Sequence, residues 1–407
     1  MKKYNLLVCC LLLSTPLFGF DSFAPPKGLD PVHVRVVWNE DPQHTATISW
    51  TTGNEASVNQ LNYGEKKSDL SRHQKADLNG VFTFSAHKKR KGAIKPFEMY
   101  YHHVNLKGLS ANTVYYFQVK SDGHASKEFY FRTAPELDED FKILSGGDSR
   151  SDGDSLTGLN FSVQINKKIA SIVELDDTVL AFAHGGDFVF HGSDDLDEWN
   201  DWLFMFEDTY ASDGRILPII PTRGNHEARG VIYGEVFNQI GDKNNYFVTY
   251  LSPQVSLITL NSNIPTAGDQ KIFLEEALKA NQGKRWQLVQ YHRPAYPAVK
   301  KPGAALQNWV PLFEKYKVPL VMESDGHALK RTVPIVAGKH VEGGVVYVGE
   351  GGLGVKQRTS KDYWYLKPPG MSMAAHHVQV ISFSKSKLVY KAIGLDGKVL
   401  DEYVIQK

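Results

Sequence analysis

Five apolar stretches of the sequence each end in side chains that are good metal donors. The clearest runs from Ile216 to Ile220 and is followed, after a glycine, by Asn225. The complete set of donors is Asp148, Asp187, Asn225, His292, Asp325 and His327. Carboxylate, carboxamide oxygen and neutral imidazole all bind divalent cations. The pattern therefore predicts one shared metal site.

Elements distant in sequence must bring these donors together. An apolar run that stops at polar residues is typical of a buried strand, and ligands of open α/β sheets collect at the carboxyl ends of the strands. Each donor alone has an ordinary explanation, because Asp148 and Asp187 also suit helix N-caps or turns and His292 suits a hydrogen-bonded core position. Turn propensity alone does not produce the pattern five times.

Length and composition bound the remaining possibilities. The chain has 407 residues, which favours two domains, and 42% of them are hydrophobic. Lys and Arg number 46 against 45 Asp and Glu, so no overall charge favours nucleic acid or an anionic membrane. We expect a globular protein that binds no nucleic acid; the oligomeric state stays open.

The first 24 residues have the pattern of a secretory signal peptide. Lys2 and Lys3 precede the apolar run Leu6 to Leu13, and small or polar residues follow to Ala24. A buried N-terminal strand is the alternative. Both cysteines of the chain lie in this segment, and no later apolar run is long enough for a membrane helix. We expect a secreted or periplasmic protein with no membrane span.

Two further segments differ in their periodicity. Residues 25–135 show short period-two runs and turns without helical periodicity, which predicts an all-β sandwich. Within it, Leu106 to Tyr116 resembles the turn and tyrosine-bearing strand of fibronectin type III-like modules. Residues 136–407 alternate strands with helical stretches such as Phe161 to Leu175 and Lys271 to Ala280, which predicts an α/β domain.

The donor motifs resemble a known family. Gly-Asp-Ser-Arg at Asp148, Gly-Asp at Asp187, Gly-Asn-His-Glu at Asn225, the block ending in His292 and Ser-Asp-Gly-His ending in His327 are similar, in order, to the signature blocks of calcineurin-like metallophosphoesterases. The preceding sandwich resembles the N-terminal domain of purple acid phosphatases. The resemblance implies a four-layer αββα sandwich with two divalent metal ions, chosen from Fe, Mn, Zn, Mg or Ca.

The resemblance also implies roles for the donors. Asp187 would bridge the ions, Asp148 and His327 would bind the first, and Asn225 and His292 the second. The partner would be a small phosphorylated substrate, whose ester a metal-bound hydroxide would attack. Two further residues are candidate catalytic groups, namely His226 as a proton donor to the leaving oxygen and Arg150 as a clamp on phosphate oxygens. For His226 the alternative is structural support, and for Arg150 a structural ion pair.

Three positions depart from the family pattern. Phe190 stands where purple acid phosphatases carry a tyrosine ligand, and Arg150 stands where other members carry a histidine. His191 is a conceivable substitute. Asp325 falls where a histidine of the second metal is expected, which favours harder cations. In an alternative alignment of this last motif, His327 falls at the position of its first histidine, and Leu329 falls at the position of its second histidine.

Three functions are compatible with this sequence. The first is an exported dinuclear phosphatase that hydrolyses phosphomonoesters. The second is a phosphodiesterase or phospholipase-type hydrolase, because the same centre serves both reactions. The third is a metal-depleted binding or adhesion protein.

Overall fold

The computed structural model describes residues 23–407 except 40, 84–95, 151–155, 191–193 and 229. The predicted signal peptide lies outside this part apart from its last two residues, as does His191. Within the described ranges, no helix has the length and apolar character needed to cross a bilayer.

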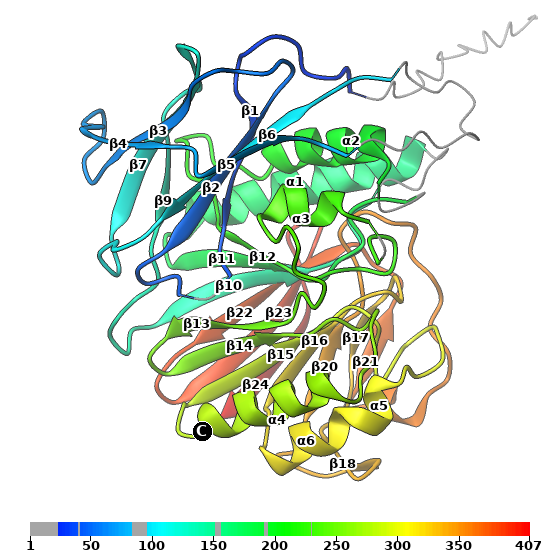
Figure 1. Ribbon diagram of the computed structural model, residues 1–407. Coiled ribbons are helices and arrows are strands. Elements are labelled where there is room, and N and C mark those ends of the chain that lie inside the picture. Colours follow the sequence, from blue (N-terminus) through cyan, green and yellow to red (C-terminus); the bar gives the residue numbers. More distant parts are fainter. Residues whose placement is uncertain (1–22, 40, 84–95, 151–155, 191–193, 229) are drawn as a thin grey trace, which may run out of the picture.

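Two facing sheets with helices on their outer faces form the body of the molecule (Figure 1). The helices are α1 (Leu156–Leu175), α2 (Leu196–Glu207) and α3 (Ile232–Phe237) on one side, and α4 (Asp269–Ala280), α5 (Ala305–Asn308) and α6 (Val310–Lys315) on the other. Apolar clusters fill the space between the sheets and beneath each helical layer. The predicted fold class, with an all-β region preceding it, is confirmed.

The first sheet has ten strands, and its central strands are buried on both faces. In spatial order they are β24 (Val399–Gln406), β23 (Lys387–Gly394), β22 (His377–Phe383), β10 (Phe141–Gly146), β11 (Val179–His184), β12 (Ile219–Pro221), β1 (Val32–Val37), β2 (Ala46–Thr52), β6 (Tyr100–Leu106) and β5 (Leu78–Val81). Strands β10, β11 and β12 are parallel, so their carboxyl ends lie at one edge.

The second sheet has seven strands. In spatial order they are β13 (Phe247–Ser252), β14 (Val255–Thr259), β15 (Trp286–Gln290), β16 (Leu320–Glu323), β20 (Val346–Gly349), β17 (Leu329–Arg331) and β21 (Met371–Met373). Strands β14, β15, β16 and β20 are parallel and buried throughout, which explains their mostly apolar sequences. A small hairpin joins β18 (Ile335–Val336) to β19 (Lys339–His340).

The N-terminal region is all-β, as predicted, and the sequence did not predict that part of it continues into the ten-stranded sheet. One of its sheets contains β3 (Asn59–Gly64), β4 (Arg72–Lys75), β7 (Val114–Ser121), β8 (His124–Ala125) and β9 (Phe129–Arg132). Its strands β1, β2, β5 and β6 belong to the ten-stranded sheet, which they join because β1 pairs in parallel with β12 at Val37 and Ile219. The amide of Trp38 also donates to the carbonyl of Ile219 at 2.9 Å. A strand this short gives no periodicity from which pairing could be predicted.

Buried polar side chains of the N-terminal region also hold α3. Nε of Arg35 donates to the carbonyl of Val236 at 2.7 Å, and Nε2 of His103 lies 2.9 Å from the carbonyl of Glu235. Because the carbonyl accepts, Nε2 of His103 carries the proton, and Nδ1 accepts from the hydroxyl of Ser49 at 2.7 Å. Both ring nitrogens of the neutral imidazole are thus satisfied.

We predict that His103 makes the fold sensitive to acid. Burial, with Arg35 nearby, lowers the pKa of His103 well below its ordinary value. Below about pH 6.5 the unfolded chain binds a proton that the folded chain does not, so stability falls as the pH falls, by at most about 1.4 kcal/mol per pH unit from this residue. Urea unfolding of His103→Gln, measured between about pH 7 and about pH 5.5, should show a weaker pH dependence than the parent.

The matched control is His340, which is exposed on β19 and whose replacement by Gln should leave the pH dependence unchanged. A parent and a His103→Gln variant with the same pH dependence would contradict the prediction.

Candidate metal centre

The six predicted donors meet at the carboxyl edge of the two sheets. Each follows a parallel strand directly or within a few residues: Asp148 follows β10, Asp187 follows β11, Asn225 follows β12, His292 follows β15, and Asp325 and His327 follow β16. Because parallel strands end at the same edge, segments far apart in sequence deliver side chains to one place. All of them are buried except Asn225, which is partly exposed.

The backbone is strained where it delivers four of these donors. Asp148, Asp187, Asp325 and His327 have φ values of 60°, 58°, 73° and 64°, in the left-handed region. For residues other than glycine this conformation costs about 1–2 kcal/mol each. Such strain clusters at functional sites because it directs side chains that relaxed geometry would not. The folded chain therefore sustains a cost to hold these donors.

Two glycines allow the Asp187 and Asn225 loops to touch. Gly186 has a φ of 93°, and a Cβ there would lie 2.6 Å from the amide nitrogen of Gly224. A Cβ on Gly224 would lie 2.1 Å from the amide nitrogen of Asp187. Any larger side chain at either position would push the two donor loops apart.

Glu227 fastens the same two loops. Its carboxylate accepts from the amides of Asp187, Phe188, Val189 and Gly224 at 3.0, 2.8, 3.0 and 3.0 Å. Burial, reinforced by the charge of Asp187, raises the pKa of Glu227 to about 7. Glu227 belongs to the Gly-Asn-His-Glu motif, but its role as an acceptor for four amides was not predicted from the sequence.

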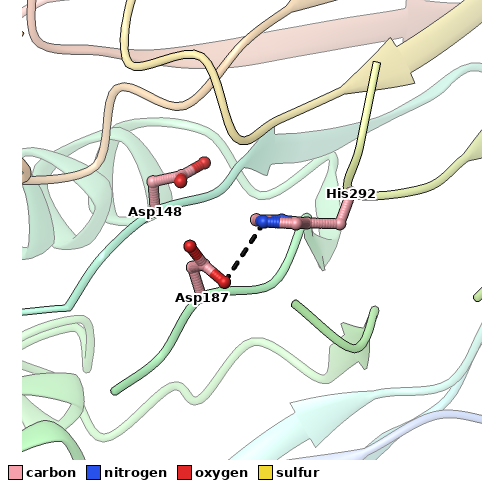
Figure 2. A group of neighbouring side chains, drawn as sticks. All are labelled: Asp148, Asp187 and His292. Carbon is pink, nitrogen blue, oxygen red and sulfur yellow. Dashed lines mark ion pairs between the residues drawn. The ribbon is translucent and has the colours of Figure 1, made fainter. Parts of the chain in front are cut away.

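The centre of the cluster is drawn in Figure 2, where Asp148, Asp187 and His292 face one another. One potential ligand atom from each lies within 4.8 Å of the others. Nε2 of His292 is 3.1 Å from Oδ1 of Asp187 and 3.5 Å from Oδ1 of Asp325. The amide oxygen of Asn225 lies 3.2 Å from the same Nε2. The donors expected for the second metal thus surround one point.

The environment of His292 fixes which ring nitrogen faces the cluster. Nδ1 donates to the carbonyl of Gly185 at 2.8 Å, so in the neutral ring the lone pair is on Nε2. Burial opposes the charged ring, but the carboxylates of Asp187 and Asp325 outweigh burial and raise the pKa of His292 well above its ordinary value. Without a metal the acceptors therefore attract a proton to the position that a cation would hold.

Asn225 adds to the excess of acceptors at this point. Its amide oxygen faces Oδ1 of Asp325 as well as His292; if the amide is turned over, its nitrogen donates to Asp325 at 2.8 Å and to His292 at 3.2 Å. With the oxygen inward, two carboxylates, an amide oxygen and an imidazole nitrogen converge. This donor set fits a divalent cation at the second position.

The first position has a different occupant. Nη1 of Arg150 lies 2.8 Å from Oδ2 of Asp187 and 3.4 Å from Oδ1 of Asp148. Nη2 lies 3.2 Å from Nε2 of His327. Only 4% of the Arg150 side chain is exposed. The three donors expected for the first metal are thus directed at a guanidinium, and this position does not fit a metal ion.

This contact changes the interpretation of Arg150. The sequence suggested a clamp on phosphate or a structural ion pair, and the geometry is that of the ion pair. The pKa of Asp187 shows the effect of these neighbours. Burial raises this pKa, but the nearby His292 and Arg150 lower it by more, so that it lies below the ordinary range of an aspartate.

Two groups at the rim complete the centre. Nδ1 of His226 donates to the carbonyl of Phe190, and Nε2 lies 3.7 Å from Oδ2 of Asp187. The His226 side chain is 24% exposed, and that of the neighbouring Lys300 is 40% exposed. Burial lowers the pKa of His226. Lys300, which the sequence analysis missed because its loop has no motif, forms an ion pair with Asp325.

The chain matches two family models in tandem. Residues 31–133 match the purple acid phosphatase N-terminal domain, and residues 160–328 match the calcineurin-like phosphoesterase domain. The chain belongs to the purple acid phosphatase-like metallophosphoesterases. These enzymes are metal-dependent phosphoric ester hydrolases. The second match includes Asp187, Asn225 and His292 but begins beyond Asp148 and Arg150.

Curated relatives of this metallophosphoesterase agree with the family. It is 24% identical to a purple acid phosphatase of Glycine max, over 77% of this chain and 68% of the relative. It is also 24% identical to a phosphoenolpyruvate phosphatase of Allium cepa, over 77% of this chain and 65% of the relative. The chain spans about two thirds of the length of these relatives.

Solved structures share the fold at low identity. A purple acid phosphatase from Lupinus luteus seeds superposes with a TM-score of 0.73 at 18% identity, covering 93% of this chain and 74% of its own. A structure of PhoD gives 0.62 at 10% identity, covering 94% and 90%. A structure described as GAP50, the anchor in the inner membrane complex of Plasmodium, gives 0.52 at 13% identity, covering 66% and 89%.

We predict that Glu227 governs metal retention in this metallophosphoesterase. Glu227→Gln replaces part of an acceptor for four amides with a donor, which loosens the loops that carry Asp187 and Asn225. Loss of a group that orients metal ligands typically costs about 10–100-fold in metal affinity. Titration of the metal-free protein with Mn²⁺ should show a loss of that size.

The exposed Glu276 on α4 provides the control, and Glu276→Gln should bind Mn²⁺ like the parent. Unchanged affinity in Glu227→Gln, with the fold intact by circular dichroism, would contradict the prediction.

Proposed function

We propose that this chain is an exported metal-dependent phosphatase that hydrolyses phosphomonoesters. The observation that carries the proposal is the convergence of Asp187, Asn225, His292 and Asp325 on one point at the sheet edge. A bound divalent ion supplies Lewis acidity there, polarising phosphate and making water a better nucleophile. Export is supported by the pattern of residues 1–24, and its check is the N-terminus of the mature protein.

The charges at the rim favour a monoester. A phosphomonoester carries more negative charge at neutral pH than a diester, and the ammonium of Lys300 lies beside the metal donors with its side chain 40% exposed. The ammonium can therefore attract a dianionic phosphate while still balancing Asp325. The names of the two curated relatives, a purple acid phosphatase and a phosphoenolpyruvate phosphatase, support the same class of substrate.

His226 is placed to handle the proton of the leaving group. Its Nδ1 is held by the carbonyl of Phe190, so Nε2 is the nitrogen directed toward the site. When the ring is protonated on both nitrogens, Nε2 would donate a proton to the departing oxygen and neutralise the charge that develops there. Because burial lowers the pKa of His226, this role calls for acidic conditions. The ring stacks with Phe190 at a centroid distance of 5.6 Å, which restricts its orientation.

A metal-depleted binding protein is the second candidate. The Arg150 guanidinium among Asp148, Asp187 and His327 favours it, because these acceptors are partly satisfied without any ion. Catalysis is favoured instead by the second metal position, where hydrogen-bond acceptors outnumber donors.

The decisive assay compares a monoester and a diester of the same phenol, with and without added Mn²⁺. We expect the monoester to react at least about tenfold faster, and a chelator to abolish the activity. Asp187→Asn removes a charge at the centre and should lower kcat/KM more than about a hundredfold, at least about 2.7 kcal/mol in barrier. A preference for the diester would indicate the phosphodiesterase alternative, and absence of hydrolysis with bound metal would favour the binding protein.

A second prediction concerns the leaving group. His226→Ala should lower kcat by about 10²–10⁴-fold with metal content unchanged, because it removes a proton donor and no metal ligand. Substrates with acidic leaving groups need little protonation and should lose least. If all leaving groups lost activity equally, His226 would instead be a phosphate-binding residue.

A further inference from the structure

We propose that the guanidinium of Arg150 replaces the first of the two metal ions, so that this chain binds one divalent ion rather than two. The inference rests on the proposed function, since it concerns the same site. The family resemblance implies a dinuclear centre. The geometry of Arg150 points to a mononuclear one.

The first argument is competition for the same atoms. Arg150 directs Nη1 and Nη2 at Asp148, Asp187 and His327 over distances of 2.8 to 3.4 Å. A metal ion would need those same three side chains at about 2.0–2.6 Å. All four residues are at most 4% exposed, so the guanidinium sits deep in the site. It would have to leave before an ion could enter.

The second argument is the match between Arg150 and Phe190. The guanidinium carbon lies 5.7 Å from the centroid of the Phe190 ring. An aromatic face attracts a guanidinium, whereas a phenyl ring cannot coordinate a metal. Phe190 occupies the place of the family's tyrosine ligand, and Arg150 the place of a histidine found in other members. Both departures thus remove metal donors, and together they form an arginine site.

The third argument concerns the two oxygens of the Asp187 carboxylate. Its Oδ2 accepts from Arg150, and its Oδ1 faces Nε2 of His292 at 3.1 Å. The carboxylate therefore spans a guanidinium and one metal position, where the family would have it span two metals. No described guanidinium enters the second position. Lys300 approaches it only from the rim, through Asp325.

The fourth argument is charge. Three carboxylates face the two positions, from Asp148, Asp187 and Asp325, and two cationic side chains face them, Arg150 and Lys300. One divalent ion reverses the remaining negative charge and leaves the site attractive to phosphate. A second would place further positive charge against the guanidinium in a buried setting, where like charges repel strongly.

Metal stoichiometry tests the inference without relying on catalysis. The protein without its predicted signal peptide is freed of metal and titrated with Mn²⁺. The bound ions per chain are counted by elemental analysis and by electron paramagnetic resonance. We expect one ion per chain, with the signal of an isolated Mn²⁺. Arg150→His, alone or combined with Phe190→Tyr, removes the guanidinium and restores donors, and should bind two ions with a spin-coupled signal. Arg72→His, exposed on β4, should still bind one.

The outcomes separate this inference from the proposed function. Two ions in the parent, with phosphatase activity, would overturn the inference and leave the function standing. One ion in the parent and two in either variant, with no hydrolysis by the parent, would support the inference and overturn the function. One ion in the parent and in both folded variants would show that Arg150 does not fill the first position. No bound ion in the parent would overturn both.

Discussion

The site is organised by the two oxygens of one carboxylate, that of Asp187. One oxygen accepts from the buried guanidinium of Arg150, and the other faces the imidazole of His292 on the second sheet. Asp187 therefore links a side chain delivered by the first sheet to one delivered by the second. Glu227 and the contact between Gly186 and Gly224 hold its backbone in a left-handed conformation that a free chain avoids. If this residue shifted, the donors of both sheets would lose their common point.

The convergence of donors could be predicted from sequence because it follows from a simple rule. Parallel buried strands have continuous apolar sequences, and their carboxyl ends share an edge, so Asp148, Asp187, Asn225, His292 and His327 could be placed together without coordinates. The helix predicted from Lys271 to Ala280 extends from Asp269 to Ala280. In each case a repeating pattern in the local sequence predicted the strand or the helix.

Other features had no such local signal. The contacts of Arg150 with Asp187 and His327 join residues that are 37 and 177 positions away from it, and nothing in its local sequence specifies them. Lys300 lies in an irregular loop and reaches Asp325 only through the tertiary fold. The ion pair of Lys300 and the four amide contacts of Glu227 are long-range consequences of chain folding. Family resemblance alone predicted two ions, because it carries over positions without carrying over the side chains that surround them.

The pairing of β1 with β12 has a consequence for any attempt to separate the N-terminal region from the phosphoesterase domain. Strand β12 has three residues, and one of its edges is covered only by β1 of the N-terminal region. A chain that began after residue 135 would expose this edge, with its unpaired amides and carbonyls, directly before the loop that carries Asn225 and His226. It would also lose the Arg35 and His103 contacts to α3. The N-terminal region thus completes one edge of the sheet that carries the site, and a boundary drawn between the two regions would cut through that sheet.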